Sequence, residues 1–350
     1  MIYIVGWGIM LLGLMVSEVV KNRSRIPAAV VIAFVAILAI FRGAVGTDTN
    51  TYEFLLESVD PAAFSGGVEP LFMVSGWLFK TVTGSAVGAV RLFALVLFGV
   101  LFYFLLHSNR NERFFLLSFF LPSFIYQYSM NTLRLGLASA VLLLVFQYIR
   151  RYRYSQRAAL SIVALAFHYS SLFNLGFLLA LRMRWTRWAS MLGFAVFVVC
   201  ALSVVLLNND YFLMKLNAYQ QVASPGRFSG LSKVVLIAVM LLAVIASRMP
   251  RPDKFKLLVL AVLLTAASFG LATVSYAGLR FLDLLSFSLP LAVMVVYNDN
   301  DLEFDWAIKL GLSLVGLISV VASYRNYLQE SGQGPSPFLP YHFLDLLGGV

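Results

Sequence analysis

The chain alternates long apolar runs with short polar segments from its first residues to its last third. Many of the runs approach the ~20 residues that an α-helix needs to cross a bilayer, and they lack the polar face of a helix in a soluble protein. The pattern therefore predicts an all-α polytopic membrane protein with about 10–12 membrane helices, some of them short or re-entrant. We expect one integral membrane domain over residues 1–350.

Two apolar stretches are too short for this pattern. The stretch from Glu69 to Gly84 predicts an interfacial or re-entrant helix. The stretch from Ala158 to Leu181 has 24 residues between two basic loops, too few for two spans of about 20 residues each. It is either a hairpin of two half-helices with His168 near its tip, or a single span. In the second case, one of the two flanking basic loops would lie on the periplasmic side and break the positive-inside rule. We favour the hairpin, because it leaves the later basic loop 248–256 on the cytoplasmic side.

Charge is sparse and unevenly placed. The chain is 61% hydrophobic and only 12% charged, whereas soluble domains carry about 25% charged residues. Its net charge of +10 does not indicate a nucleic-acid partner, because 16 of the 26 Lys and Arg residues lie in five short loops. Such loops mark the cytoplasmic ends of spans. They are residues 21–25, 109–113, 150–157, 182–187 and 248–256.

The segments at the opposite ends of the runs are longer and richer in Gly, Pro and aromatic residues. We place them on the periplasmic side, together with the N-terminus. They are the loop 42–70, the hinge 129–134, the loop 208–230, the turn 276–280 and the C-terminal tail 325–350. Most residues that could carry chemistry fall in or beside these segments.

Arg134 is the least expected of these residues. It lies in the hinge SMNTLR between two apolar runs, Phe114–Tyr128 and Leu135–Ile149. A guanidinium at this depth is costly unless it faces a cavity or pairs with an anion, so it is a candidate for function. Asn131 shares its helical face if the helix has already begun there. The alternative is an interfacial arginine whose side chain extends to the lipid headgroups.

Polar groups also gather where the second apolar run ends. Arg42, Asp48 and Tyr52 surround Gly46, which permits a tight turn. These groups could bind a substrate, and Asp48 could act as a general base. The alternative is that Asp48 or Thr49 only caps the following helix.

Glu69 and His168 each have a structural and a functional interpretation. Glu69 precedes Pro70 at the start of an apolar stretch, which is typical of a helix cap. His168 stands in apolar sequence, where a lone histidine is more often a hydrogen-bonded structural residue, but its place at a helix break favours function. No second histidine or carboxylate lies at metal-ligand spacing, so we predict no metal site and no cofactor.

Arg280 repeats the pattern of Arg134 at another outer helix end, close to Tyr276 and Asp283. An ion pair between Arg280 and Asp283 that only holds helices together is a strong alternative. Several arginines in a membrane-embedded cavity suit phosphate or pyrophosphate, and tyrosines suit sugars. The sequence contains no P-loop and no dinucleotide-binding motif.

Taken in order, these motifs resemble those of the EpsG family, the Wzy-type polymerases of bacterial exopolysaccharide and capsule. Each motif is weak alone, but the ordered set spans nearly the whole chain. The chain departs from the family at Leu135, where Gln is usual, and at Leu71, where Gly is usual. The motifs are RGAVGTDTNTY (42–52), EPLF (69–72), SMNTLRLGLA (129–138), AFHYSSL (166–172), Arg280 before LLSFSLP, and a terminal PY that contains Tyr341.

The resemblance implies a multi-pass glycosyltransferase of the bacterial inner membrane with a GT-C-like helical bundle and a metal-independent, inverting mechanism. Such enzymes transfer a glycan from undecaprenyl pyrophosphate to the next lipid-linked repeat unit at the periplasmic face. Its partners would be these glycans, membrane lipids and a chain-length co-polymerase. We expect catalytic roles for Arg134, Arg280, His168 and Asp48, with substrate contacts from Arg42, Glu69, Asn131, Tyr52, Tyr276 and Tyr341. A glycan ligase and a flippase for lipid-linked sugars are the alternatives.

Overall fold

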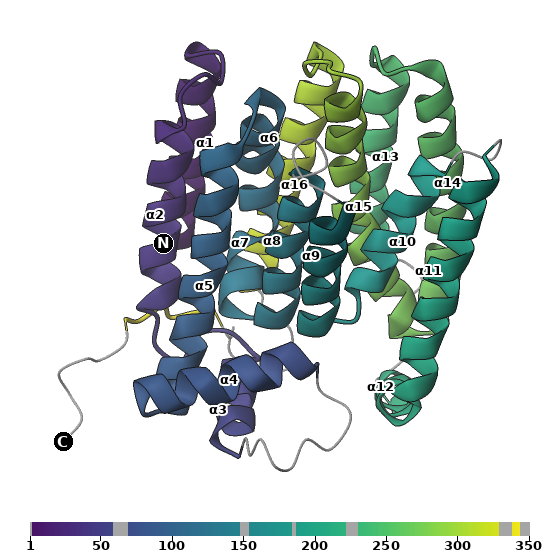
Figure 1. Cartoon of the computed structure of the whole chain (residues 1–350). Helices are drawn as coiled ribbons and strands as arrows, with labels where there is room; N and C mark the ends of the chain where they lie inside the picture. The colour runs from purple at the N-terminus through teal and green to yellow at the C-terminus, as the bar shows by residue number, and fades with distance from the viewer. Residues whose placement is uncertain are drawn as a thin grey trace. The chain divides into compact units, whose positions relative to one another are not determined.

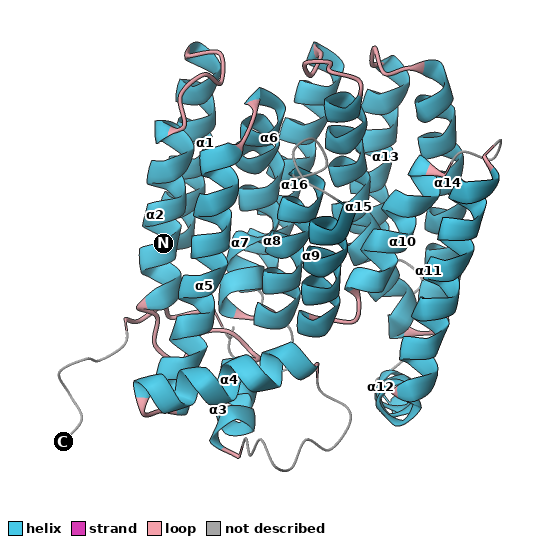
Figure 2. Cartoon of the chain, viewed as in Figure 1, coloured by secondary structure: helices cyan, strands magenta, loops and turns pink. Residues whose placement is uncertain are grey.

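The computed structural model describes residues 2–58, 69–147, 154–183, 187–221, 230–328 and 338–343. These residues fold into helices joined by short loops, and no strand occurs among them (Figure 2). Parts of the predicted loops lie outside the described residues: 59–68, 150–153, 184–186, 222–229, 329–337 and 344–350. The chain divides into two compact units, and a single membrane domain stays a prediction.

The first unit consists of Met1–Phe64, Glu69–Tyr169 and Leu312–Val350. In Figure 1, its helices α3 (Thr49–Glu57) and α4 (Pro70–Thr83) lie across the end of the unit at which α5 (Ala86–His107) begins. The other helices are α1 (Ile2–Val19), α2 (Ile26–Ile40), α6 (Arg110–Phe115), the π-helical turn η2 (Leu116–Phe120), α7 (Leu121–Met130), α8 (Leu133–Gln147), α9 (Tyr154–Phe167) and α16 (Trp306–Leu328) from Leu312 onward.

The second unit consists of Ser65–Val68 and Ser170–Gly311. Besides the first residues of α16, its helices are α10 (Ser171–Arg182), α11 (Trp188–Leu207), α12 (Asn209–Gln221), α13 (Leu231–Ala246), α14 (Arg251–Ala272) and α15 (Tyr276–Asp299). This unit contains Arg280, Tyr276 and Asp283, whereas the other candidate residues belong to the first unit.

Length and composition confirm the predicted class of an all-α polytopic membrane protein. Among the described residues, six helices are long and apolar enough to cross a membrane, and five shorter helices are also apolar. The helix α4 is in neither group, so its interfacial or re-entrant position stays a prediction. A GT-C-like arrangement also stays a prediction.

The two breaks that the sequence indicates are present. Only Asn131 and Thr132 separate α7 from α8, so two apolar runs do meet at a very short hinge. The stretch 158–181 falls into α9 and α10, and His168 is the first residue after α9. Both breaks place polar side chains at helix ends.

Candidate functional site

Glu69 joins two basic side chains from distant parts of the sequence. Its Oε2 accepts a hydrogen bond from Arg134 Nη1 at 2.6 Å, and its Oε1 lies 2.6 Å from His168 Nδ1. The Glu69 side chain is fully buried, while that of Arg134 is 23% exposed and that of His168 is 14% exposed. One buried carboxylate therefore holds a guanidinium and an imidazole that both remain partly accessible.

Each of these three groups comes from the end of a helix. Glu69 occupies the N-cap position of α4, but its side chain makes no capping hydrogen bond. Arg134 is the second residue of α8, and His168 directly follows α9. The interpretation of Glu69 as only a helix cap is therefore wrong, because its carboxylate binds side chains from two other segments instead of the N-terminus of its own helix.

Two buried aromatic rings pack against the Arg134 guanidinium. Its Cζ lies 5.6 Å from the ring centroid of Tyr52 and 5.5 Å from that of Phe72. These two rings contact each other at 5.5 Å, and their residues are only 4% and 0% exposed. Cation–π contacts of this kind fix the plane of a guanidinium. Tyr52, predicted to contact substrate, thus supports Arg134, and its burial raises its pKa.

The Glu69 carboxylate stays charged despite its burial. Burial alone raises its pKa, but the hydrogen bond and charge of His168 and the charge of Arg134 outweigh that effect and lower the pKa from 4.5 to about 2. An ionised Glu69 holds His168 in the tautomer or charge state that carries a proton on Nδ1. The other ring nitrogen, Nε2, is then the one that can exchange a proton with a substrate.

The loop before α3 is tied to the hinge. Gly46 has a left-handed backbone (φ +103), as the predicted tight turn requires. Asn131 Oδ1 accepts hydrogen bonds from Thr47 Oγ1 at 2.6 Å and from the Asp48 backbone N–H at 2.8 Å. Because α8 begins at Leu133, Asn131 and Arg134 do not share a helical face. Direct substrate contact by Asn131 stays a prediction.

Asp48 lies at the N-cap position of α3, yet its side chain makes no capping hydrogen bond. Capping therefore does not account for its carboxylate, which is partly buried beside the hinge. Its role as a general base stays a prediction.

Arg42 and Tyr341 belong to a different cluster of the first unit. The Arg42 side chain is fully buried, and Tyr341 donates a hydrogen bond to the Leu38 carbonyl at 2.8 Å. Their neighbour Arg91 is also buried. The sequence analysis missed Arg91, because a single arginine inside the apolar run of α5 carries no motif.

The remaining candidates lie in the second unit. Asp283 Oδ1 pairs with Lys233 Nζ at 2.8 Å, which gives it a partner other than Arg280. Arg280 is exposed at the first turns of α15, and Tyr276 begins that helix. The predicted catalytic role of Arg280 and the predicted substrate contact of Tyr276 stay predictions. Within the described residues, no group of three or more His, Cys, Asp or Glu side chains could hold a metal ion.

The chain matches the model of a known protein family. The family model described as the EpsG family matches residues 25–343, well over half of the chain. No curated protein and no solved structure matches it.

Proposed function

The chain belongs to the EpsG family, and from this premise we propose that it lengthens an exopolysaccharide, capsule or O-antigen glycan at the periplasmic face of the bacterial inner membrane. Family membership indicates a polysaccharide polymerase role in a membrane. In the finer proposal, a growing glycan leaves its undecaprenyl pyrophosphate carrier and joins a hydroxyl of the next lipid-linked repeat unit.

One observation supports this chemistry most directly, namely the bridge from Glu69 to both His168 and Arg134. The transfer needs a base for the acceptor hydroxyl and positive charge for the leaving pyrophosphate. Both groups are present, and a single carboxylate orients them on its two oxygens.

His168 is the proposed general base. Its Nε2 takes the proton of the acceptor hydroxyl as that oxygen attacks the anomeric carbon, and the bond from this carbon to the pyrophosphate oxygen breaks. Glu69 is a positioning residue, which holds the imidazole through Nδ1 and stabilises the imidazolium that forms. Its complete burial and two contacts favour this role over that of a base.

Arg134 is the proposed partner of the leaving group. Negative charge grows on the pyrophosphate in the transition state, and a guanidinium fixed by Glu69 and two aromatic rings stabilises that charge without reorganising. An inverting displacement places the base and the leaving group on opposite faces of the sugar.

The test uses purified protein in detergent and lipid-linked repeat units, with glycan length measured on a gel. The proposal predicts polymers from the wild type and none from His168→Ala, while Asp48→Asn keeps activity. Full activity of His168→Ala would refute the assigned base. Glycan transfer only to a foreign acceptor would identify a ligase instead, and no glycan lengthening in detergent would favour a flippase.

A further inference from the structure

Arg42 and Arg91, the arginine pair, have hydrogen-bond donors that the described part of the chain leaves open. Arg42 is 0% exposed; it donates to two backbone carbonyls, and its Nη2 has no hydrogen-bond partner among the described residues. Arg91 is 7% exposed, and within the same described ranges its Nε and Nη1 have no partner. Buried polar groups are normally hydrogen-bonded, so three open guanidinium nitrogens indicate a missing acceptor.

The charge of the pair is only partly balanced. Glu53 Oε1 lies 3.4 Å from Arg91 Nη2, and its side chain is 19% exposed. Burial lowers the pKa of Arg42, and the charge of Arg91 lowers it further, to about 9, which still leaves Arg42 charged at neutral pH. Two guanidinium groups beside one carboxylate suit a phosphate or pyrophosphate anion.

The C-terminal residues 338–343, here called the strap, lie against the segment that carries Arg42. Arg42 and Phe343 form an antiparallel bridge, and the Gly43 backbone N–H donates to the His342 carbonyl at 2.9 Å. An anion that reaches both guanidinium groups must displace the strap or enter beside it.

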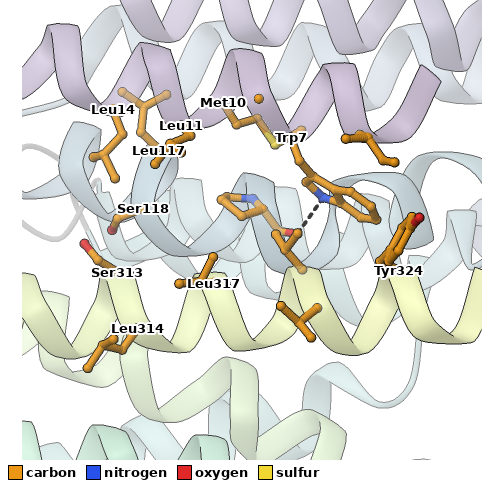
Figure 3. Close-up of a pocket in the computed structure, with 15 residues that line it drawn as sticks. Trp7, Met10, Leu11, Leu14, Leu117, Ser118, Ser313, Leu314, Leu317 and Tyr324 are labelled. Carbon is orange, nitrogen blue, oxygen red and sulfur yellow. Dashed lines mark hydrogen bonds between the residues drawn. The ribbon is translucent and has the colours of Figure 1, made fainter. Parts of the chain in front are cut away.

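An apolar groove of about 580 Å³ lies in the same unit, between α1, α16 and the region of η2. Its volume is within the ~300–1,000 Å³ range of small-molecule sites. Figure 3 shows Trp7 and Tyr324 at one end of the groove and Leu14 and Leu314 at the other. The lining is almost entirely aliphatic and aromatic, so the groove suits a long hydrocarbon chain.

The local sequence explains the shape of the groove wall. Pro122 has no N–H to donate to the Ser118 carbonyl, and the Leu121 N–H instead bonds to the Leu116 carbonyl, which gives the π-helical turn. A Cβ at Gly316 would lie only 1.9 Å from the Ser118 oxygen, so glycine lets α16 approach the turn closely.

A row of aromatic rings connects the groove with the arginine pair. From the groove end, ring centroids are separated by 6.4 Å for Tyr324–Trp7, 5.5 Å for Trp7–Tyr126, 5.1 Å for Tyr126–Tyr3 and 5.9 Å for Tyr3–Tyr341. The charges of the arginine pair act on Tyr341, opposing the burial that raises its pKa to about 12. Midway, the buried Tyr126 hydroxyl is a further group with no hydrogen-bond partner in the described ranges.

We propose that the groove and the arginine pair form one site for an isoprenoid lipid pyrophosphate, with the hydrocarbon tail in the groove and the pyrophosphate on Arg42 and Arg91. This inference rests on the proposed function, in which donor and acceptor each carry such a lipid. Two lipid pyrophosphates need two cationic sites. Arg134 serves the one that reacts, and the arginine pair holds the other.

The experiment measures how many ligand molecules each protein chain binds. Radiolabelled farnesyl pyrophosphate is dialysed to equilibrium against the purified full-length chain in detergent, with inorganic pyrophosphate and farnesol as competitors. Two molecules per chain are expected for the wild type. Arg91→Gln and Arg134→Ala should each retain one, because each removes a different site. Weakening at the arginine pair should be about tenfold or more.

Gly8→Phe tests the tail without touching the pair. Gly8 lines the groove, and a Cβ added there meets no atom within 4 Å, so a phenylalanine side chain can begin there without a clash and is expected to occupy the groove. Gly99→Phe is the matched control, since Gly99 is also helical and open. Gly8→Phe should lose one farnesyl pyrophosphate, and Gly99→Phe should lose none.

Three outcomes would overturn the inference: two bound molecules in Arg91→Gln, two in Gly8→Phe, or inorganic pyrophosphate competing at the pair as well as farnesyl pyrophosphate does. The last would identify a site for free anions. A wild type that binds two molecules but never lengthens a glycan would contradict the proposed function and leave the lipid site supported. If the wild type polymerises the glycan and both Arg91→Gln and Gly8→Phe still bind two molecules, the lipid site is refuted while the proposed function stands.

Discussion

The two cationic clusters of the first unit differ in how their charge is balanced. Arg134 shares the Glu69 carboxylate with His168 at 2.6 Å on each oxygen, and two rings pack against its guanidinium. The arginine pair has one carboxylate at 3.4 Å and three guanidinium nitrogens without a partner in the described residues. Both oxygens of the Glu69 carboxylate have a basic partner within the chain, whereas the arginine pair has donors without a partner among the described residues, which we propose a ligand fills.

This difference distinguishes a cluster suited to catalysis, around Glu69, from one suited to ligand binding, at the arginine pair. A site that performs proton transfer needs groups fixed before the substrate arrives, because reorganisation costs rate. A site that only holds an anion can leave its donors open and gain its last acceptors from the ligand. The substitutions below test this contrast.

His168→Ala should have the largest effect. Loss of a general base lowers the rate by a factor on the order of 10²–10⁴, and polymer formation in the detergent assay should fall accordingly. The folded state should persist, because His168 lies at a break between helices. Its thermal unfolding in the same detergent is the control. Unchanged polymerisation would show that His168 is not the general base, and the cluster around Glu69 would then no longer be the catalytic one of the two.

Arg134→Ala should reduce polymerisation by about 10²–10³, equivalent to ~3–4 kcal/mol of transition-state stabilisation. Arg134→Lys restores the charge but not the planar contacts with Tyr52 and Phe72, so recovery should be partial. Rates at saturating substrate separate this effect from weaker binding. Full rescue by lysine would show that charge alone matters there.

Glu69→Gln should lower stability in a pH-dependent way. The carboxyl pKa falls from 4.5 in the unfolded chain to about 2 in the folded one, so its contribution is present above about pH 4.5 and is lost as the pH falls toward 2. The contribution at pH 7 is roughly 3 kcal/mol. Unfolding of wild type and variant should therefore differ at pH 7 and converge near pH 2. A gap independent of pH would contradict the ionised bridge.

Arg91→Gln should have the smallest effect on stability, about 1 kcal/mol or less in the absence of lipid, because its contact with Glu53 is long and the Glu53 side chain is partly exposed. The variant loses the 3.4 Å contact with Glu53, but it also removes open buried donors and repulsion from Arg42. The same unfolding assay at pH 7 measures it. A loss as large as that of Glu69→Gln would mean that the chain itself balances the pair, and the two clusters would then be alike.

The sequence indicated where the helices break and turn, but not which side chains pair across those breaks. The hinge before Arg134, the break at His168 and the turn at Gly46 follow from short polar interruptions in apolar runs, which local rules detect. For Glu69, an equally local rule led to the wrong interpretation. A Glu-Pro pair at a helix start is typical of a cap, and only contact with two remote segments turns the carboxylate elsewhere.

Arg91 gave no signal at all. It stands among aliphatic residues of α5, and its importance comes from Arg42 and Glu53, which lie about 50 and 40 positions earlier along the chain. The strap likewise brings residues 338–343 next to Arg42 across nearly the whole sequence.

The sequence by itself determined the membrane class, the helix breaks and the ordered motifs of the family, since each depends on residues close together in the chain. Only the tertiary structure decided which charges share a carboxylate and which lack one. Charge balance in a buried site depends on distances between side chains from different segments, and packing sets those distances.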